Sequence, residues 1–180
     1  GVALYATLEG PLPEGLEGPV VIMPEDDDAL FAALEARRAP RSTMILVHGA
    51  PARPGVRATL AVLLTAPADG ARYTLDHPFV ARELARAERW LGLSAPLARS
   101  FAAHVVLDPA YFAEGGAPGG ALYGDVRGLW RSGPLHDVAH RDPRRPWLHR
   151  VGAAVHPGGG IPAVLGGALI ATRALCGTAR

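Results

Sequence analysis

The sequence predicts an α+β fold: a mixed or antiparallel sheet with helices on one face. Strand-like apolar segments are separated by turns rich in glycine and proline, and two other segments have the apolar spacing of amphipathic helices. The chain has 180 residues, of which 49% are hydrophobic and 19% are charged, so it is globular and long enough to bury a core.

The first part of the chain predicts four strands and one helix. The helix is expected from the acidic residues at 26–28 to about Arg38. The helix dipole favours carboxylates in the first turn of a helix and arginines in the last turn. Leu30, Phe31 and Leu34 are expected on its inner face. The strands are expected at residues 2–8, 18–23, 43–48 and 56–65.

The clearest amphipathic helix is expected from about residue 76 to Leu91. Its apolar stripe is Val80, Leu84, Ala87 and Leu91. A polar face is expected in solvent, made of Arg82, Arg86, Glu88 and Arg89. A shorter helix is expected at 96–103, a strand at 104–107, and mostly loop over 109–146.

A strand at 147–155 and an apolar helix at 162–175 are expected near the C-terminus, joined by a loop that contains three consecutive glycines. The helix is apolar nearly all round, so we expect it to be buried. A glycine loop before a helix directs free backbone N–H groups and the positive end of the helix dipole to one place. Such a place suits a phosphate, a carboxylate or an electron-rich ring oxygen.

Composition narrows the classes of partner. The formal net charge of +1 gives no reason to expect nucleic acid. The longest apolar run, residues 161–175, is too short to span a bilayer. Cys176 is the only cysteine, so no disulfide can form within the chain; we expect a cytoplasmic protein and an inert, packed thiol. Because the chain opens in strand-like sequence, we also expect it to be a piece of a longer protein.

From about residue 120 onward the chain resembles the C-terminal portion of the phytoene desaturase family, the carotenoid-type FAD-dependent desaturases. Gly120-Ala-Leu-Tyr-Gly124 is similar to the family's Gly-x-x-aromatic-Gly turn. Arg141-Asp142 is similar to an Arg-Asp pair that the family has shortly before its last strand. Val151-Gly-Ala is similar to the end of that strand. His156-Pro-Gly-Gly-Gly-Ile-Pro162 is close to its terminal flavin loop. The sequence departs from the family at Ala154, Val155, Ala163 and Asp137-Val138.

The resemblance implies FAD as cofactor and a division into a substrate-binding-like domain, 1–140, and the end of the FAD-binding domain, 141–180. The family's N-terminal Gly-x-Gly-x-x-Gly turn has no counterpart here, so an FAD-binding half is expected elsewhere as a partner, and this chain alone is expected to be inactive. The implied cofactor-binding residues are Gly152, His156, Pro157, Gly158, Gly159, Gly160, Ile161 and Pro162.

The implied reaction is desaturation of an apolar polyene, with hydride transfer to flavin. Flavin-dependent isomerisation or saturation of a polyene is an alternative, and so is a non-catalytic domain that binds an apolar ligand or a partner. His156 is a candidate for flavin contact or proton removal, or for fixing the turn by hydrogen bonds. Arg141 and Asp142 order the loop under the flavin, reach the polar parts of the cofactor, or form a local ion pair.

Other candidates concern substrate, metal and association. Tyr123 and Trp130 are candidate substrate contacts, with packing in a core as the alternative. His136 and His140 are four residues apart, as helical zinc ligands are, but Pro134 and Pro143 disfavour such a helix, so no metal site is expected. A polyene drawn from a membrane would require peripheral contact with the bilayer. Exposed apolar surface where the missing half docks would promote self-association.

Overall fold

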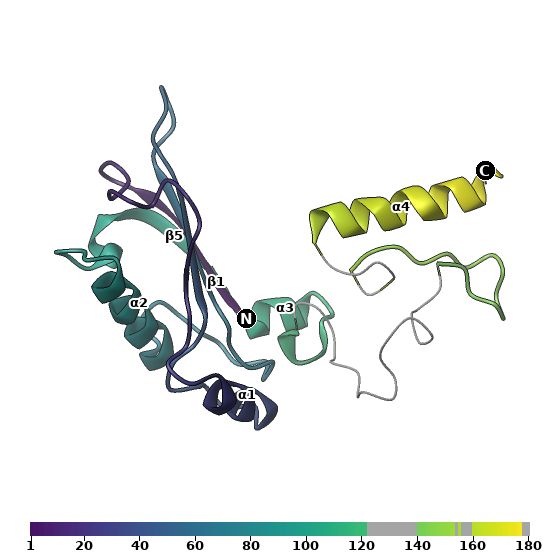
Figure 1. The fold of residues 1–180 in the computed structure, drawn as a ribbon, viewed down its shortest axis with the longest axis horizontal. Helices are drawn as coiled ribbons and strands as arrows, with labels where there is room; N and C mark the ends of the chain where they lie inside the picture. The colour runs from purple at the N-terminus through teal and green to yellow at the C-terminus, as the bar shows by residue number, and fades with distance from the viewer. Residues whose placement is uncertain (122–139, 154, 156–159, 178–180) are drawn as a thin grey trace. The chain divides into compact units, whose positions relative to one another are not determined.

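The computed structural model describes residues 1–121, 140–153, 155 and 160–177, which fall into two compact units, Gly1–Leu122 and Tyr123–Arg180. Figure 1 shows the elements of both units. In the first unit the order is β1 (Val2–Leu8), β2 (Val20–Ile22), α1 (Asp27–Glu35), β3 (Ile45–Ala50), β4 (Thr59–Leu64), α2 (Pro78–Trp90), η1 (Leu97–Ser100), β5 (Phe101–Leu107), α3 (Pro109–Glu114) and η2 (Pro118–Gly120). The second unit contains α4 (Ile161–Leu175).

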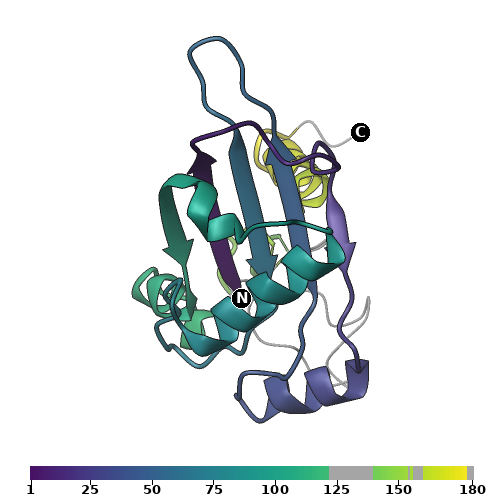
Figure 2. The same ribbon diagram turned by 90° about the vertical axis from the view of Figure 1, so that its left-hand side faces the viewer.

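The first unit is built on a five-stranded sheet in the order β2-β3-β4-β1-β5, and every neighbouring pair is antiparallel. Helix α2 runs across one face of this sheet (Figure 2). The predicted α+β class, with an antiparallel sheet and helices on one face, is therefore confirmed.

The hydrophobic core lies between α2 and the face of the sheet that it covers. Val80, Leu84 and Ala87 of the predicted stripe are all buried, and Leu91 packs against them. Phe79 adds an aromatic ring to the same layer. The sheet contributes alternate residues of its central strands, as a pleated strand requires: Val2, Leu4, Ala6, Leu8, Ile45, Val47, Leu60, Val62 and Leu64.

A buried ion pair joins α2 to the start of β3 and the end of β2. Glu83 has no exposed surface; it accepts hydrogen bonds from Arg86 Nε at 2.9 Å and from the backbone N–H of Thr43 at 3.2 Å. Arg86 also donates to the carbonyl oxygens of Met23, at 3.0 Å, and Thr43. The prediction that Arg86 lies in solvent was wrong, because these backbone acceptors and Glu83 replace the water that the guanidinium loses.

Helix α1 begins as predicted but ends earlier. Asp26 caps it by accepting from the N–H of Ala29 at 2.9 Å, and the helix ends at Glu35, shortly before Arg37 adopts a φ of 51°. Leu30 is buried as expected. The expectation for Phe31 was wrong: its side chain is 61% exposed, because only a narrow side of this short helix faces the core.

Two predicted elements were wrong in type. The helix expected at 96–103 is the short η1 followed by β5, whose pairing with β1 from Ala3 to Leu8 overrides local helix preference. No strand forms at the described residues of 147–155; His149 makes only an isolated bridge with Arg141. Within the loop-rich stretch the sequence also missed α3, which begins at a proline and is capped by Asp108.

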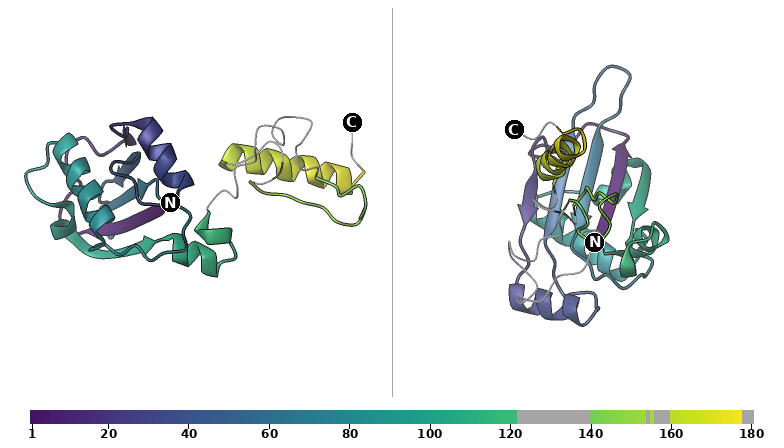
Figure 3. Two further views of the ribbon diagram at one scale, coloured as in Figure 1. Left: turned by 90° about the horizontal axis from the view of Figure 1, so that it is seen from below. Right: turned by 90° about the vertical axis from the view of Figure 1, so that its right-hand side faces the viewer.

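Helix α4 forms close to the expected bounds, but the prediction that it is buried was wrong. Ile161 is 84% exposed and Leu165 is 60% exposed, while among its described side chains only Gly167 and Ala171 are buried. Segment 140–153 lies alongside it within the second unit (Figures 1 and 3). Cys176, expected to be packed, is exposed. The described residues of the second unit include too few apolar partners to cover a helix that is apolar nearly all round.

Replacing Glu83 tests whether the buried ion pair holds α2 in place. We expect Glu83→Gln to lower the free energy of unfolding by about 3 kcal/mol, because it leaves the buried Arg86 charge without a counter-charge. Denaturant unfolding followed by circular dichroism measures the change. Glu114→Gln is the matched control: its pair with Arg72 is about two-thirds exposed on both sides, so its loss costs less than about 1 kcal/mol. Equal losses would contradict this interpretation.

Candidate functional site

The face of the sheet that α2 does not cover is also apolar. The strand register aligns its outward side chains in rows across the strands. The first row contains Val21, Leu46, Leu63, Ala3 and Leu107. The second contains His48, Ala61, Tyr5 and Val105, and the third contains Ala50, Thr59, Thr7 and Ala103. None of these side chains is Asp, Glu or Arg.

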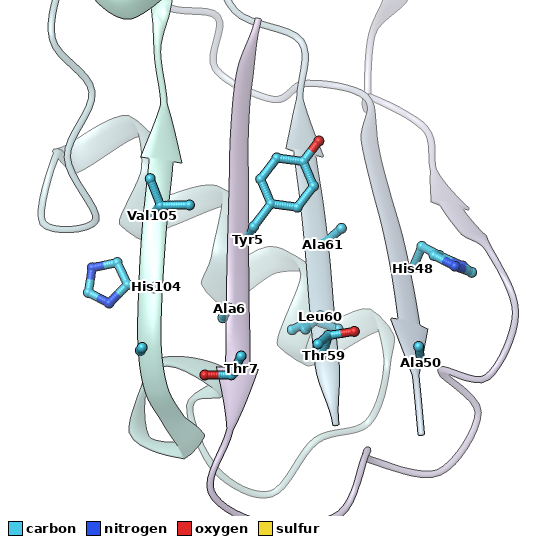
Figure 4. A pocket seen from close by; sticks show the side chains of 11 residues that line it. Tyr5, Ala6, Thr7, His48, Ala50, Thr59, Leu60, Ala61, His104 and Val105 are labelled. Carbon is cyan, nitrogen blue, oxygen red and sulfur yellow. The ribbon is translucent and has the colours of Figure 1, made fainter. Parts of the chain in front are cut away.

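A hollow with a volume of about 650 Å³ lies over the second and third rows (Figure 4). Tyr5 stands in its middle and is 44% exposed; Val105 is 50% exposed. Small residues, Ala61 and Ala103, leave space beside the tyrosine ring. A shallow apolar floor with few polar groups is the form that binding sites for apolar molecules take. We take this hollow and the rows beside it as the candidate ligand surface and call it the open face.

Sequence reasoning missed the open face, although its signal is present. In β1 the residues on both faces are apolar or uncharged, so the segment Val-Ala-Leu-Tyr-Ala-Thr-Leu lacks the polar alternation of a strand with one face in water. β4 and β5 share this property. Apolar residues at both alternating positions indicate a sheet that is covered on both sides or that binds apolar material on one.

The second unit contains the described part of the predicted flavin loop. Gly160 precedes α4 with a φ of 91°, and a Cβ at this position would meet no atom within 4 Å. The first hydrogen bond of the helix runs from the N–H of Val164 to the carbonyl of Gly160, so the N–H of Ile161 comes before the hydrogen-bonded ladder begins. Gly152 has a φ of 120° and an equally open Cβ position.

Several predicted site residues lie outside the described residues. They are His156, Pro157, Gly158, Gly159, Tyr123 and Trp130, and also His136. Of the described members, Gly160, Ile161 and Pro162 lie together at the start of α4, where the side chains of Ile161 and Pro162 are exposed, and Gly152 lies in the segment before the loop.

Asp142 organises the turn before the loop. Its carboxylate accepts from the N–H groups of Arg144 at 2.9 Å and Arg145 at 3.0 Å, and pairs with the guanidinium of Arg150. It does not pair with Arg141, which instead donates to the carbonyl of Pro146 at 2.9 Å. The N–H of Arg144, then the Arg150 guanidinium, hold the pKa of the Asp142 carboxyl below its usual value. Arg141 and Asp142 therefore help to order this turn through separate partners and do not form an ion pair with each other.

The described part of the chain holds no group of three or more His, Cys, Asp or Glu side chains placed to bind a metal ion. Two ring nitrogens, Nε2 of His140 and Nδ1 of His149, are buried there without a hydrogen-bond partner. None of the helices over these residues has the length and apolar character needed to cross a bilayer.

Together, the described features define an α+β unit with an open apolar sheet face, and an apolar helix that begins at a glycine. No protein-family model matches the chain. Hydroxyneurosporene desaturase of Rubrivivax gelatinosus is 40% identical over 118 residues, which cover 62% of this chain and 22% of that protein. The chain is thus similar to part of a carotenoid desaturase, and it matches about a fifth of that relative's length.

The titration of Asp142 tests the structure of the turn. We expect its carboxyl pKa to lie below that of an ordinary aspartate, and Arg150→Gln to raise it only part of the way, because the N–H donors of Arg144 and Arg145 remain. Since the pKa is lowered by folding, Asp142 stabilises the turn above its ordinary pKa, and this contribution is lost as the pH falls through the lowered value. Carboxyl carbon NMR measures both pKa values; an ordinary pKa in the unmodified chain would contradict the turn.

Proposed function

We propose that this chain is the C-terminal portion of an FAD-dependent oxidoreductase that desaturates an apolar, polyene-like substrate. The observation that carries the proposal is the open face: a broad, uncharged and apolar sheet surface in a chain that is similar to part of a hydroxyneurosporene desaturase. An uncharged surface of this kind matches a long hydrocarbon, which has no groups to pair with charges.

The open face would bind the body of the substrate by removing apolar surface from water. Each 100 Å² of apolar area buried contributes roughly 2.5 kcal/mol before the costs of association. Tyr5 and Val105 project from the sheet and would contact the chain of the substrate, while Ala61 leaves room on the other side of Tyr5. Because these residues stand on paired strands, the substrate would be held by a rigid floor.

The described end of the glycine loop fits a flavin. The positive φ and open Cβ position of Gly160 let a flat ring approach the backbone, and the N–H of Ile161 and the start of the α4 dipole can face electron-rich ring oxygens. When bound, the flavin supplies the acceptor for the hydride. The residues that would hold it are the eight named above, from Gly152 to Pro162; one of them, His156, is also a candidate for proton removal.

The apolar side chains of α4 support the same proposal. Leu165, Leu169 and Ile170 are about half exposed or more in the second unit. We propose that they pack against the FAD-binding half, which this chain needs as its partner. Without that half the same surface would promote self-association. A polyene of low solubility would also require contact between the complete enzyme and a bilayer surface.

Two related functions would use the same surfaces. A flavin-dependent isomerase or saturase would share both the loop and the open face. A non-catalytic domain that binds an apolar ligand would share only the open face. The colour of the purified protein distinguishes a flavin enzyme from a non-catalytic domain. Analysis of the polyene product distinguishes a desaturase from an isomerase or saturase.

The proposal is tested on the longest natural protein that contains this chain. We expect it to purify yellow with flavin absorption bands and to convert a carotenoid to a product with one more double bond. A colourless protein that does not take up added FAD would contradict the proposed function.

Gly160→Ala tests whether the last residue of the glycine loop, directly before α4, contributes to flavin binding. We expect this variant to lose most of its bound flavin, because a Cβ at a φ of 91° strains the backbone by about 1–2 kcal/mol and intrudes on the surface that faces the ring. Gly166→Ala is the matched control: it lies in the same helix, a Cβ there meets no atom within 4 Å, and flavin retention should be unchanged. Equal flavin content in both variants would exclude this role for Gly160.

A further inference from the structure

The two edges of the sheet in the first unit differ in length and in sequence. The edge strand β2 has three residues, lies between Pro19 and Pro24, and is followed by acidic residues at 25–28. Short length, proline and charge keep an edge strand from pairing with another chain. The opposite edge strand, β5, has seven residues and contains no proline, no glycine and no Asp, Glu, Lys or Arg. By these criteria β5 is open to pairing.

Hydrogen bonds at the end of β1 show which of its residues face β5. The N–H of Leu8 donates at 2.8 Å to the carbonyl of Ala58, the residue before β4. The N–H of Glu9 donates at 2.8 Å to the carbonyl of Ser100, the residue before β5. Since the residues of a strand bond alternately to its two neighbours, the odd-numbered residues of β1 bond to β5.

The outer side of β5 therefore carries backbone groups that no described strand pairs with. The partners of the odd-numbered β1 residues are Ala103, Val105 and Leu107. The N–H and C=O groups of the two residues between them, His104 and Val106, point away from β1. β5 is the last strand in the sheet order, and in Figure 2 it forms one side of the sheet. Such groups on a long, uncharged edge are a template for one more strand.

We infer that β5 pairs with β5 of a second copy of this chain, antiparallel, about a two-fold axis that passes through Val105. In this register Val105 lies opposite the partner's Val105, His104 lies opposite the partner's Val106, and Ala103 lies opposite the partner's Leu107. An edge without charges is complementary in charge to itself, and a two-fold axis lets the same surface serve both copies. The inference concerns association and does not depend on flavin or on the reaction.

The shape of the strand selects this register. Between Phe101 and Ala103 the pairing with β1 shifts by one residue, so the regular part of β5 is residues 103–107. Val105 is the centre of that segment, so pairing about it uses the whole segment. His104 and Val106 then exchange both backbone hydrogen bonds with the partner's Val106 and the partner's His104, because their groups point outward. Val105 stands in a pair without hydrogen bonds, where opposite Cα atoms lie about 4.5 Å apart.

The side chains suit the same pairing. Val105 is 50% exposed, and the partner's Val105 would cover it; pairs of branched side chains stabilise neighbouring strands. The small Ala103 leaves space for the larger Leu107 of the partner subunit. Because the axis is perpendicular to the sheet, the open faces of both copies would lie on the same side of one continuous sheet. An edge of this length is a small interface beside the roughly 1,200 Å² that stable complexes bury, so we expect a weak, reversible dimer.

Charge exchange at Val105 tests both the edge and the register. We would measure association of the 180-residue chain by sedimentation velocity over a range of concentrations. Val105→Lys and Val105→Glu should each weaken association roughly fivefold to tenfold, because each places like charges opposite one another across the axis. An equimolar mixture of the two variants should recover the association of the unmodified chain, because lysine then lies opposite glutamate. Recovery in the mixture separates this contact from self-association through α4, which these variants leave unchanged.

Cysteine pairing gives a second measurement. Cys176→Ser removes the only thiol of the chain. In that background Val105→Cys should give a disulfide-linked dimer on oxidation, because opposite residues of a pair without hydrogen bonds lie within disulfide range. Val21→Cys in the same background is the matched control: Val21 is 54% exposed and lies on the protected edge β2, so it should stay mostly unlinked. Non-reducing electrophoresis measures the linked fraction, and circular dichroism checks that every variant folds.

Four results would overturn the inference: a chain that stays monomeric, association that Val105→Lys leaves unchanged, no recovery in the mixture, or equal linking at Val105 and Val21. The longest natural protein that contains this chain tests the other possible occupant of the edge, a strand from residues upstream. Val105→Lys and Val105→Glu should weaken its association too, with recovery on mixing. An effect confined to the 180-residue chain would show that upstream residues cover β5, and would also overturn the inference.

Discussion

In the first unit, helix α2 covers one face of a sheet that is apolar on both faces, and the rest of that unit depends on this constraint. Helix α2 presents one apolar stripe and packs it on one side of the strands. The opposite side, with Tyr5 and Val105 about half exposed, has no helix of the first unit across it. Leaving so much apolar surface in water is unfavourable unless a ligand or another part of a protein covers it. The proposed function assigns this role to an apolar substrate.

The charges of the first unit are arranged so that they leave the open face neutral. Glu83 and Arg86 are buried on the covered side, where they fix α2 to the backbone at Met23 and Thr43. The only polar side-chain groups that line the hollow of the open face are the hydroxyl, phenol and imidazole groups of Thr, Tyr and His. Stability and binding are thus assigned to opposite sides of the same strands, so a residue on the open face can be changed without disturbing the core.

The sequence predicted most of what depends on local patterns. The stripe of α2 and the capped start of α1 were correct because periodicity and helix-end chemistry are short-range. The sequence failed to predict structure that depends on residues far apart in the chain. Arg86 is buried because it donates to distant backbone acceptors. Residues 101–103 form part of β5, not of a helix, because β1 pairs with them. For residues 156–159, which lie outside the described residues, the flavin loop stays a prediction that rests on the family resemblance. The apolar pattern of β1 signals an open face, but the residues that compose it depend on the register of all five strands, which no single segment contains.

Methyl NMR of the chain during addition of retinol tests the central claim most directly. The account predicts shifts at Val105, Ala61 and Thr7, which face the hollow, and no shift at Val47 and Val62, which face α2. Shifts confined to Val47 and Val62, or the absence of any shift on the open face while retinol binds elsewhere, would contradict it.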